Sequence, residues 1–167
     1  MSSVDDVIAD IDFAIEQYTE AIGNTVAERR ALRNALACIY ELRAHREGPW
    51  GSEEKKAYYP RAKASRDGLV TEGIVWVRGK MTHRLTEARS PSAQPLLPGP
   101  NTFLGEHTFP GSNIVWRPST EITSQTGGSD TEVERRGFYE DYVAGQPVLE
   151  GLHAAREFLV NDPGPTL

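Results

Sequence analysis

The segment VDDVIADIDFAIEQYTEAI, residues 4–22, decides the fold class. Its apolar residues recur in steps of four and three, so they form one stripe along a helix. These residues are Val4, Ile8, Ile11, Ile15, Tyr18 and Ile22. Ser3 and Asp6 stand before the stripe in the spacing of a capping box, and Gly23-Asn24 follows it as a stop signal. The segment therefore predicts an amphipathic helix that must pack its apolar side against other elements.

A second helix is predicted directly after the first. Thr25 and Glu28 form another capping box, and apolar residues continue at helical spacing until Gly48-Pro49. Because the connection between the two helices is only a few residues long, we expect an antiparallel helical hairpin.

Further helices are predicted on both sides of a segment of different composition. A short helix over residues 52–59 breaks at Pro60, and a long helix covers residues 61–88. The long helix carries an apolar stripe at Val70, Ile74, Val77, Met81 and Leu85. Helical spacing returns at residue 131, and Pro147 suits the first turn of the last helix.

Residues 90–130 are rich in Pro, Gly, Ser and Thr. Within them, residues 102–104 and 113–116 can pair as a short β-hairpin. Strands do not alternate with helices along the chain, which argues against a doubly wound α/β fold. We therefore predict an all-α fold in a single domain, a bundle of four to five helices. Residues 1–89 supply the core helices, residues 90–130 the irregular insertion with or without its hairpin, and residues 131–162 the C-terminal helices.

Length and composition narrow the class of protein. The chain has 167 residues, of which 38% are hydrophobic, and a formal net charge of −6. No apolar run reaches the roughly 18 residues of a membrane span, and the acidic N-terminus does not resemble a secretory signal. Cys38 is the only cysteine, which fits a reducing compartment. We expect a cytoplasmic protein with no membrane contact, whose acidity disfavours a broad nucleic-acid surface but leaves room for a local site.

Several common enzyme signatures are missing from the sequence. It contains no P-loop, no dinucleotide-binding glycine motif, no His-Glu-x-x-His motif and no nucleophile elbow. Glu150 and His153 have the spacing of a di-iron ligand pair, but the second pair that such a site needs is absent. We therefore expect neither a metal nor a cofactor.

One motif remains, Arg78-Gly79-Lys80-Met81-Thr82-His83. It resembles the Arg-x4–6-His signature of the HEPN superfamily, although the family often has a polar residue where this chain has Gly79. Members are all-α bundles, and many are metal-independent endoribonucleases of toxin and defence systems, with the active site in a cleft between two protomers. The resemblance covers about residues 4–88. It implies a homodimer that acts on RNA, with Arg78 and His83 as catalytic residues.

Elementary chemistry agrees with these roles. RNA cleavage without a metal needs a base for the 2′-hydroxyl and a cation for the phosphate, which a histidine and an arginine supply. Lys80, Thr82 and Arg84 would be further contacts to the phosphate. On a straight helix, however, residues five apart are separated by about 140° of rotation. Arg78 and His83 can therefore act together only if the helix bends or ends between them, or if two protomers contribute one group each.

The alternative function is a non-enzymatic helical interaction module, such as a mobile-element accessory, immunity or antitoxin-type partner protein. An acidic helical chain with an irregular insertion fits this function. Phe103, Phe109 and Trp116 of the insertion would then be either exposed contacts to a protein partner or a small satellite core on the bundle. A metal-dependent bundle enzyme is a third hypothesis, which the ligand count disfavours.

Overall fold

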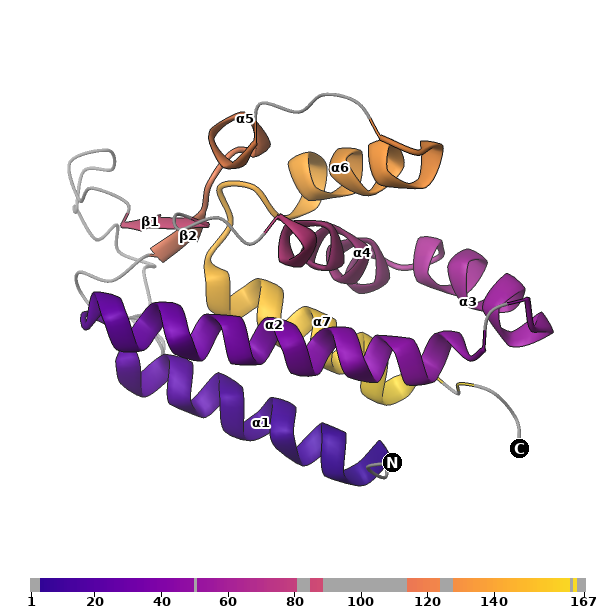
Figure 1. Ribbon diagram of the computed structural model, residues 1–167, viewed down its shortest axis with the longest axis horizontal. Helices are drawn as coiled ribbons and strands as arrows, with labels where there is room; N and C mark the ends of the chain where they lie inside the picture. Colours follow the sequence, from indigo (N-terminus) through magenta and orange to yellow (C-terminus); the bar gives the residue numbers. More distant parts are fainter. Residues whose placement is uncertain are drawn as a thin grey trace, which may run out of the picture.

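The computed structural model describes residues 4–49, 51–80, 85–88, 114–123, 128–162 and 164. Within these residues the protein is a bundle of helices with one small two-stranded sheet (Figure 1). The predicted all-α bundle with an insertion is confirmed. The elements are α1 (Val4–Ala21), α2 (Thr25–Glu47), α3 (Glu53–Lys63), α4 (Arg66–Gly79), β1 (Thr86–Ala88), β2 (Ile114–Trp116), α5 (Ser119–Ile122), α6 (Asp130–Tyr142) and α7 (Val148–Asn161).

The predicted helical hairpin forms the base of the bundle. α1 and α2 lie side by side, with the chain reversing at Gly23, whose φ of 91° is in the left-handed region. Asn24 then caps α2, since its side chain accepts a hydrogen bond from the backbone N–H of Ala27 at 3.2 Å. Of the predicted stripe, Ile11, Ile15 and Tyr18 are buried, whereas Val4, Ile8 and Ile22 are only partly buried. Val7 and Ala14 complete the buried face of α1.

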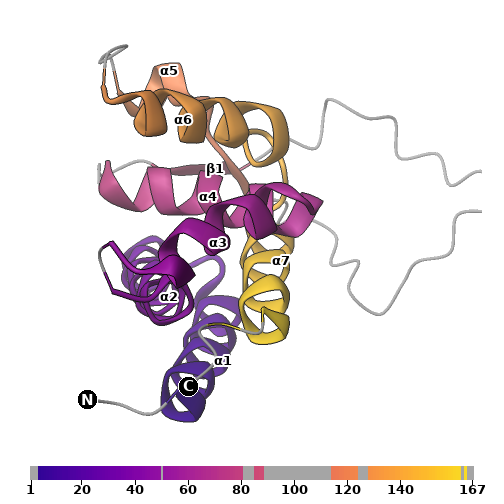
Figure 2. The ribbon, with the colours of Figure 1, turned by 90° about the vertical axis from the view of Figure 1, so that its right-hand side faces the viewer.

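α4 is the central helix. Figure 2 shows it between α2 and α6, with α7 beside it. Every residue from Val70 to Val77 is buried, as expected for a helix that is surrounded by other elements rather than packed on one side. Gly73 permits a close approach of α6, because a Cβ at this position would lie 3.0 Å from the backbone N and Cα of Tyr139. The rings of Trp76 and Tyr139 pack at a centroid distance of 5.0 Å across the same interface.

The prediction of one long helix over residues 61–88 is wrong. α3 continues through Pro60 to Lys63, and a new helix begins after Ser65, whose hydroxyl accepts from the Gly68 N–H at 3.1 Å. A side-chain cap of this kind starts a helix at a new angle, which the continuous apolar stripe does not reveal. α4 ends at Gly79, and the chain is extended again by Thr86.

The sheet differs from the predicted hairpin in its pairing. β2 lies antiparallel to β1, with Thr86 opposite Trp116 and Ala88 opposite Ile114. Residues 102–104, the predicted partner of β2, lie outside the described residues, and so do Phe103 and Phe109. β2 is also bonded on its other side, where Trp116 N–H donates to Gln146 O at 3.1 Å.

Trp116 is fully buried and belongs to the main hydrophobic core, so it is neither an exposed contact nor part of a separate satellite core, the two alternatives that the sequence left open. Gly151 of α7 leaves room for the indole, because a Cβ there would lie 3.0 Å from Trp116 Nε1. The segment after the insertion is thus anchored to the bundle by one large side chain. None of the helices that the structure describes is both long and apolar enough to cross a membrane.

Gly68, at the start of α4, gives a test of the close packing between α4 and the end of α3. A Cβ at Gly68 would lie 2.1 Å from the carbonyl oxygen of Ala62, so we expect Gly68→Ala to lower the free energy of unfolding by about 1–3 kcal/mol. The matched control is Gly137→Ala in α6, where no atom lies within 4 Å of the added carbon. That variant should be stabilised by about 0.5–1 kcal/mol through helix propensity. Urea unfolding measures both, and equal effects of the two variants would contradict the packing described.

Candidate functional site

Arg78 lies in the last turn of α4, and its guanidinium rests on an aromatic ring of α2. The guanidinium carbon is 3.9 Å from the centroid of Tyr40, whose side chain is 38% exposed. A guanidinium that stacks in this way uses its face and leaves its N–H groups at the edge for hydrogen bonds. Within the described part of the chain, no carboxylate pairs with Arg78. The arrangement can therefore present a cation to an anionic ligand.

The end of α4 also decides where the rest of the motif can go. The helix stops at Gly79, so the separation of about 140° that a straight helix would impose between Arg78 and His83 does not apply. The structure thereby meets the condition that the helix bends or ends between the two residues. Thr82, His83 and Arg84 lie outside the described residues.

Lys80 is engaged within the protein. Its ammonium pairs with the Glu132 carboxylate of α6 and lies 5.7 Å from the centroid of the Trp76 ring. To bind a substrate phosphate, Lys80 would have to exchange this carboxylate for the new anion. Of the five predicted site residues, the structure thus describes Arg78 and Lys80, and of these two only Arg78 has its charge unpaired among the described groups.

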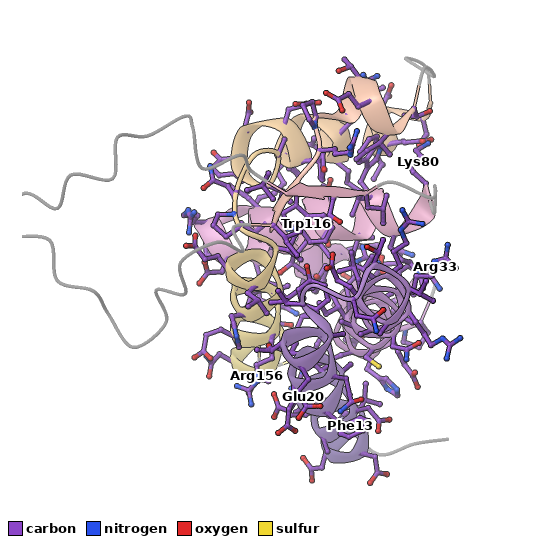
Figure 3. All side chains as sticks on the ribbon, turned by 90° about the vertical axis from the view of Figure 1, so that its left-hand side faces the viewer. Phe13, Glu20, Arg33, Lys80, Trp116 and Arg156 are labelled. Atoms are coloured by element: carbon purple, nitrogen blue, oxygen red, sulfur yellow. The ribbon has the colours of Figure 1, made fainter. Side chains whose placement is uncertain are left out.

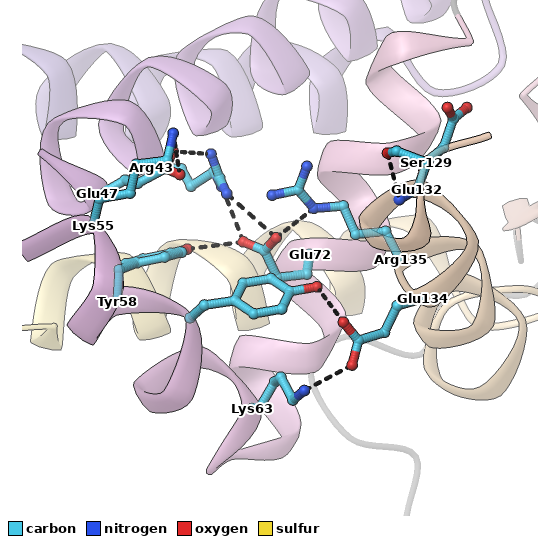
Figure 4. A network of polar contacts seen from close by, with 11 residues as sticks. Arg43, Glu47, Lys55, Tyr58, Lys63, Glu72, Ser129, Glu132, Glu134 and Arg135 are labelled. Atoms are coloured by element: carbon cyan, nitrogen blue, oxygen red, sulfur yellow. Dashed lines mark hydrogen bonds and ion pairs between the residues drawn. The ribbon is translucent and has the colours of Figure 1, made fainter. Parts of the chain in front are cut away.

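In the middle of α4, the carboxylate of Glu72 is fully buried and receives donors from three other helices (Figure 4). Arg43 of α2 donates through Nε at 2.9 Å, and Tyr58 of α3 donates through its hydroxyl at 3.1 Å. Arg135 of α6 donates through Nε at 2.7 Å. A buried carboxylate is tolerated only when its charge is paired and its lone pairs are filled, and these three residues do both.

Further ion pairs extend this network toward the surface. Glu47 pairs with Arg43, and Lys55 Nζ lies 3.0 Å from the same carboxylate. On the α6 side, Glu134 accepts from Tyr59 and from Lys63 Nζ at 2.7 Å (Figure 4). The network therefore joins α2, α3, α4 and α6.

The network keeps the Tyr58 hydroxyl protonated and the Arg43 guanidinium charged. Burial, together with the charge of Glu72, raises the pKa of the Tyr58 hydroxyl far above its ordinary value, so Tyr58 remains a donor. Burial alone would lower the pKa of Arg43, but the attraction and hydrogen bond of Glu72 outweigh it and raise this pKa. Both groups keep the form that Glu72 requires, which indicates a structural rather than a proton-transferring role.

A shallow depression between α1 and α7 also collects titratable side chains. It is lined by His153 together with Asp12, Asp67 and Arg156. Asp12 and Arg156 already form a two-point ion pair at 2.7 and 2.9 Å, and the hydrogen bond from Arg156 lowers the pKa of Asp12. Among the residues that the structure describes, no group of three His, Cys, Asp or Glu side chains could hold a metal ion.

Comparison of the chain with protein-family models, with curated proteins and with solved structures gave no match. The function must therefore be argued from the residues themselves.

Sequence reasoning missed Tyr40 as part of this site. The signal available was the spacing of Arg33 and Tyr40, which lie seven residues apart and hence on the same face of α2. The contact between Tyr40 and Arg78 joins two helices and cannot be read from local spacing.

The Glu72 network yields a second prediction. Glu72→Gln removes the charge that balances two arginines, and breaking a buried pair in this way costs about 3–5 kcal/mol of unfolding free energy. Glu134→Gln is the matched control, because its pair with Lys63 is 39% and 44% exposed and should contribute less than about 1 kcal/mol. Thermal or urea unfolding measures the difference. Similar values for the two variants would contradict the role given to Glu72.

Proposed function

We propose that this protein is a HEPN-like, metal-independent endoribonuclease that acts as a cytoplasmic homodimer in a toxin or defence system. The observation that carries the proposal is the contact of Arg78 with the Tyr40 ring at the end of α4, in which no carboxylate of the described residues pairs with the guanidinium. A guanidinium held in this way suits the charge that develops on a phosphate during cleavage.

The proposed reaction uses His83 as the base. Its imidazole takes the proton of the ribose 2′-hydroxyl, and the 2′-oxygen forms a bond to phosphorus while the bond to the 5′-oxygen breaks. The leaving 5′-oxygen takes up a proton, and a cyclic phosphate remains on the other fragment. Arg78 binds the non-bridging oxygens throughout, with Lys80, Thr82 and Arg84 as additional contacts.

The end of α4 at Gly79 supports this arrangement, because α4 does not extend to His83 and so does not impose its rotation between Arg78 and His83. In the dimer implied by the HEPN resemblance, Arg78 of one protomer and His83 of the other would meet across the cleft.

The proposal predicts cleavage of single-stranded RNA in the presence of EDTA. His83→Ala should lower the cleavage rate by about 10²–10⁴-fold through loss of the base, and Arg78→Ala should lower it to a similar extent. Gel analysis of labelled RNA measures the rates. Mixing the two inactive variants should restore part of the activity if each protomer contributes one group.

Two matched controls separate this chemistry from general effects of substitution. His153→Ala removes an exposed histidine of α7, and Arg66→Ala removes an exposed arginine at the opposite end of α4. Both variants should cleave at the wild-type rate. RNA left intact by the wild-type protein, or full activity of His83→Ala, would end the enzymatic proposal.

One observation favours the alternative function, a non-enzymatic interaction module. α1 carries six acidic residues and no basic residue, and Phe13 in its middle is 62% exposed. Such a helix face suits a protein partner with basic residues around an apolar pocket. A monomer that binds no protein partner would count against this alternative.

A further inference from the structure

We propose that a single-stranded RNA lies along α2 on a strip formed by Arg29, Arg33, Tyr40 and Arg78, and that this strip leads the strand to the cleavage site. The inference rests on the proposed function for its choice of RNA, but it concerns binding, which can be measured without cleavage.

Helix geometry places the α2 members of the strip in line. At 100° per residue, Arg29, Arg33 and Tyr40 fall within about 40° of rotation. The helix rises about 16 Å between Arg29 and Tyr40, which matches roughly five nucleotides at the stacked spacing of about 3.4 Å. The strip ends at the Tyr40 ring, where Arg78 joins it from α4.

The charges of the strip are available to a ligand. Arg29 and Arg33 are exposed, and no carboxylate in the described ranges forms an ion pair with either. They stand four residues apart, a spacing at which like charges on a helix repel each other. A bound phosphate chain would relieve this repulsion.

Tyr40 and Arg78 provide the contact that distinguishes a single strand from a duplex. Unpaired bases stack on aromatic rings and on guanidinium planes, whereas the bases of a duplex are covered by their neighbours. A base placed on the outer face of Arg78 would extend the stack that Arg78 already makes with Tyr40. Arginines in line with such a stack match a single-strand site better than a protein interface.

The rest of the surface would orient the strand. All six acidic residues of α1 are exposed, and α1 packs against a different side of α2. Figure 3 shows Arg33 and Lys80 along one side of the molecule, with Glu20 of α1 below and Arg156 on the other side. An RNA is therefore repelled from α1 and attracted to the strip, although the whole chain has a net charge of −6.

The test measures binding of a short fluorescent single-stranded RNA by anisotropy in the His83→Ala background, so that the probe stays intact. Tyr40→Ala should weaken binding about tenfold or more, and Tyr40→Phe should preserve it because the ring remains. Arg29→Ala and Arg33→Ala should each reduce the slope of log affinity against log salt by about 0.7, as expected for one lost phosphate contact. Arg66→Ala, which lies at the far end of α4, should change neither quantity.

Each outcome bears on one proposal. If the strip variants bind the single strand as tightly as Arg66→Ala does, or if the same RNA binds equally well as a duplex, the strip is overturned even where cleavage is observed. If the wild-type protein cleaves no RNA but binding depends on Tyr40 and the two arginines, the strip stands and the endoribonuclease proposal falls.

Discussion

The buried carboxylate of Glu72 is the constraint on which the arrangement of the helices depends. It sits in the buried part of the central helix, and its charge is balanced only when α2, α3 and α6 bring their donors to it. An alternative packing that moved any one of these helices would leave a charge or a donor unpaired in the core. Apolar side chains can pack in several compact arrangements of the helices. Only an arrangement that brings all three donors to the Glu72 carboxylate also satisfies its buried charge.

The same constraint reaches the candidate site. Arg43 holds α2 against α4 from within, and three residues before it Tyr40 lies under Arg78 at the surface. The buried Arg43 of α2 therefore helps to fix the position of the Arg78 guanidinium at the surface of α4. This explains how a side chain in the last turn of a helix, where backbone order usually declines, can still be held in a defined place.

Local patterns were enough to predict the hairpin of α1 and α2 and the last helix, because each has a regular apolar stripe with a stop signal. They failed between residues 61 and 88, where the Ser65 cap starts a new helix before the stripe begins, and where α4 ends at Gly79 although the stripe continues to Leu85. The partner of β2 was also missed, since it lies 26 or more residues away. For the candidate site, the motif predicted Arg78 as a site residue, but the contacts of Tyr40 and Glu72 join separate helices and could not be read from it. A glutamate within the apolar run from Leu69 to Val77 was the one visible sign of a buried charge.

The short ladder between β1 and β2 brings together the two residues that flank positions 89–113 of the sequence. Ala88 and Ile114 are paired across the ladder, so their Cα atoms lie about 5 Å apart. The buried side chain of Trp116 and its backbone hydrogen bonds to Gly145 and Gln146, before α7, hold β2 against the bundle. The connection between Ala88 and Ile114 is thus a position at which the chain can be shortened or exchanged. A two-residue turn could replace residues 89–113, or a foreign peptide could be grafted there, with the helical scaffold left intact.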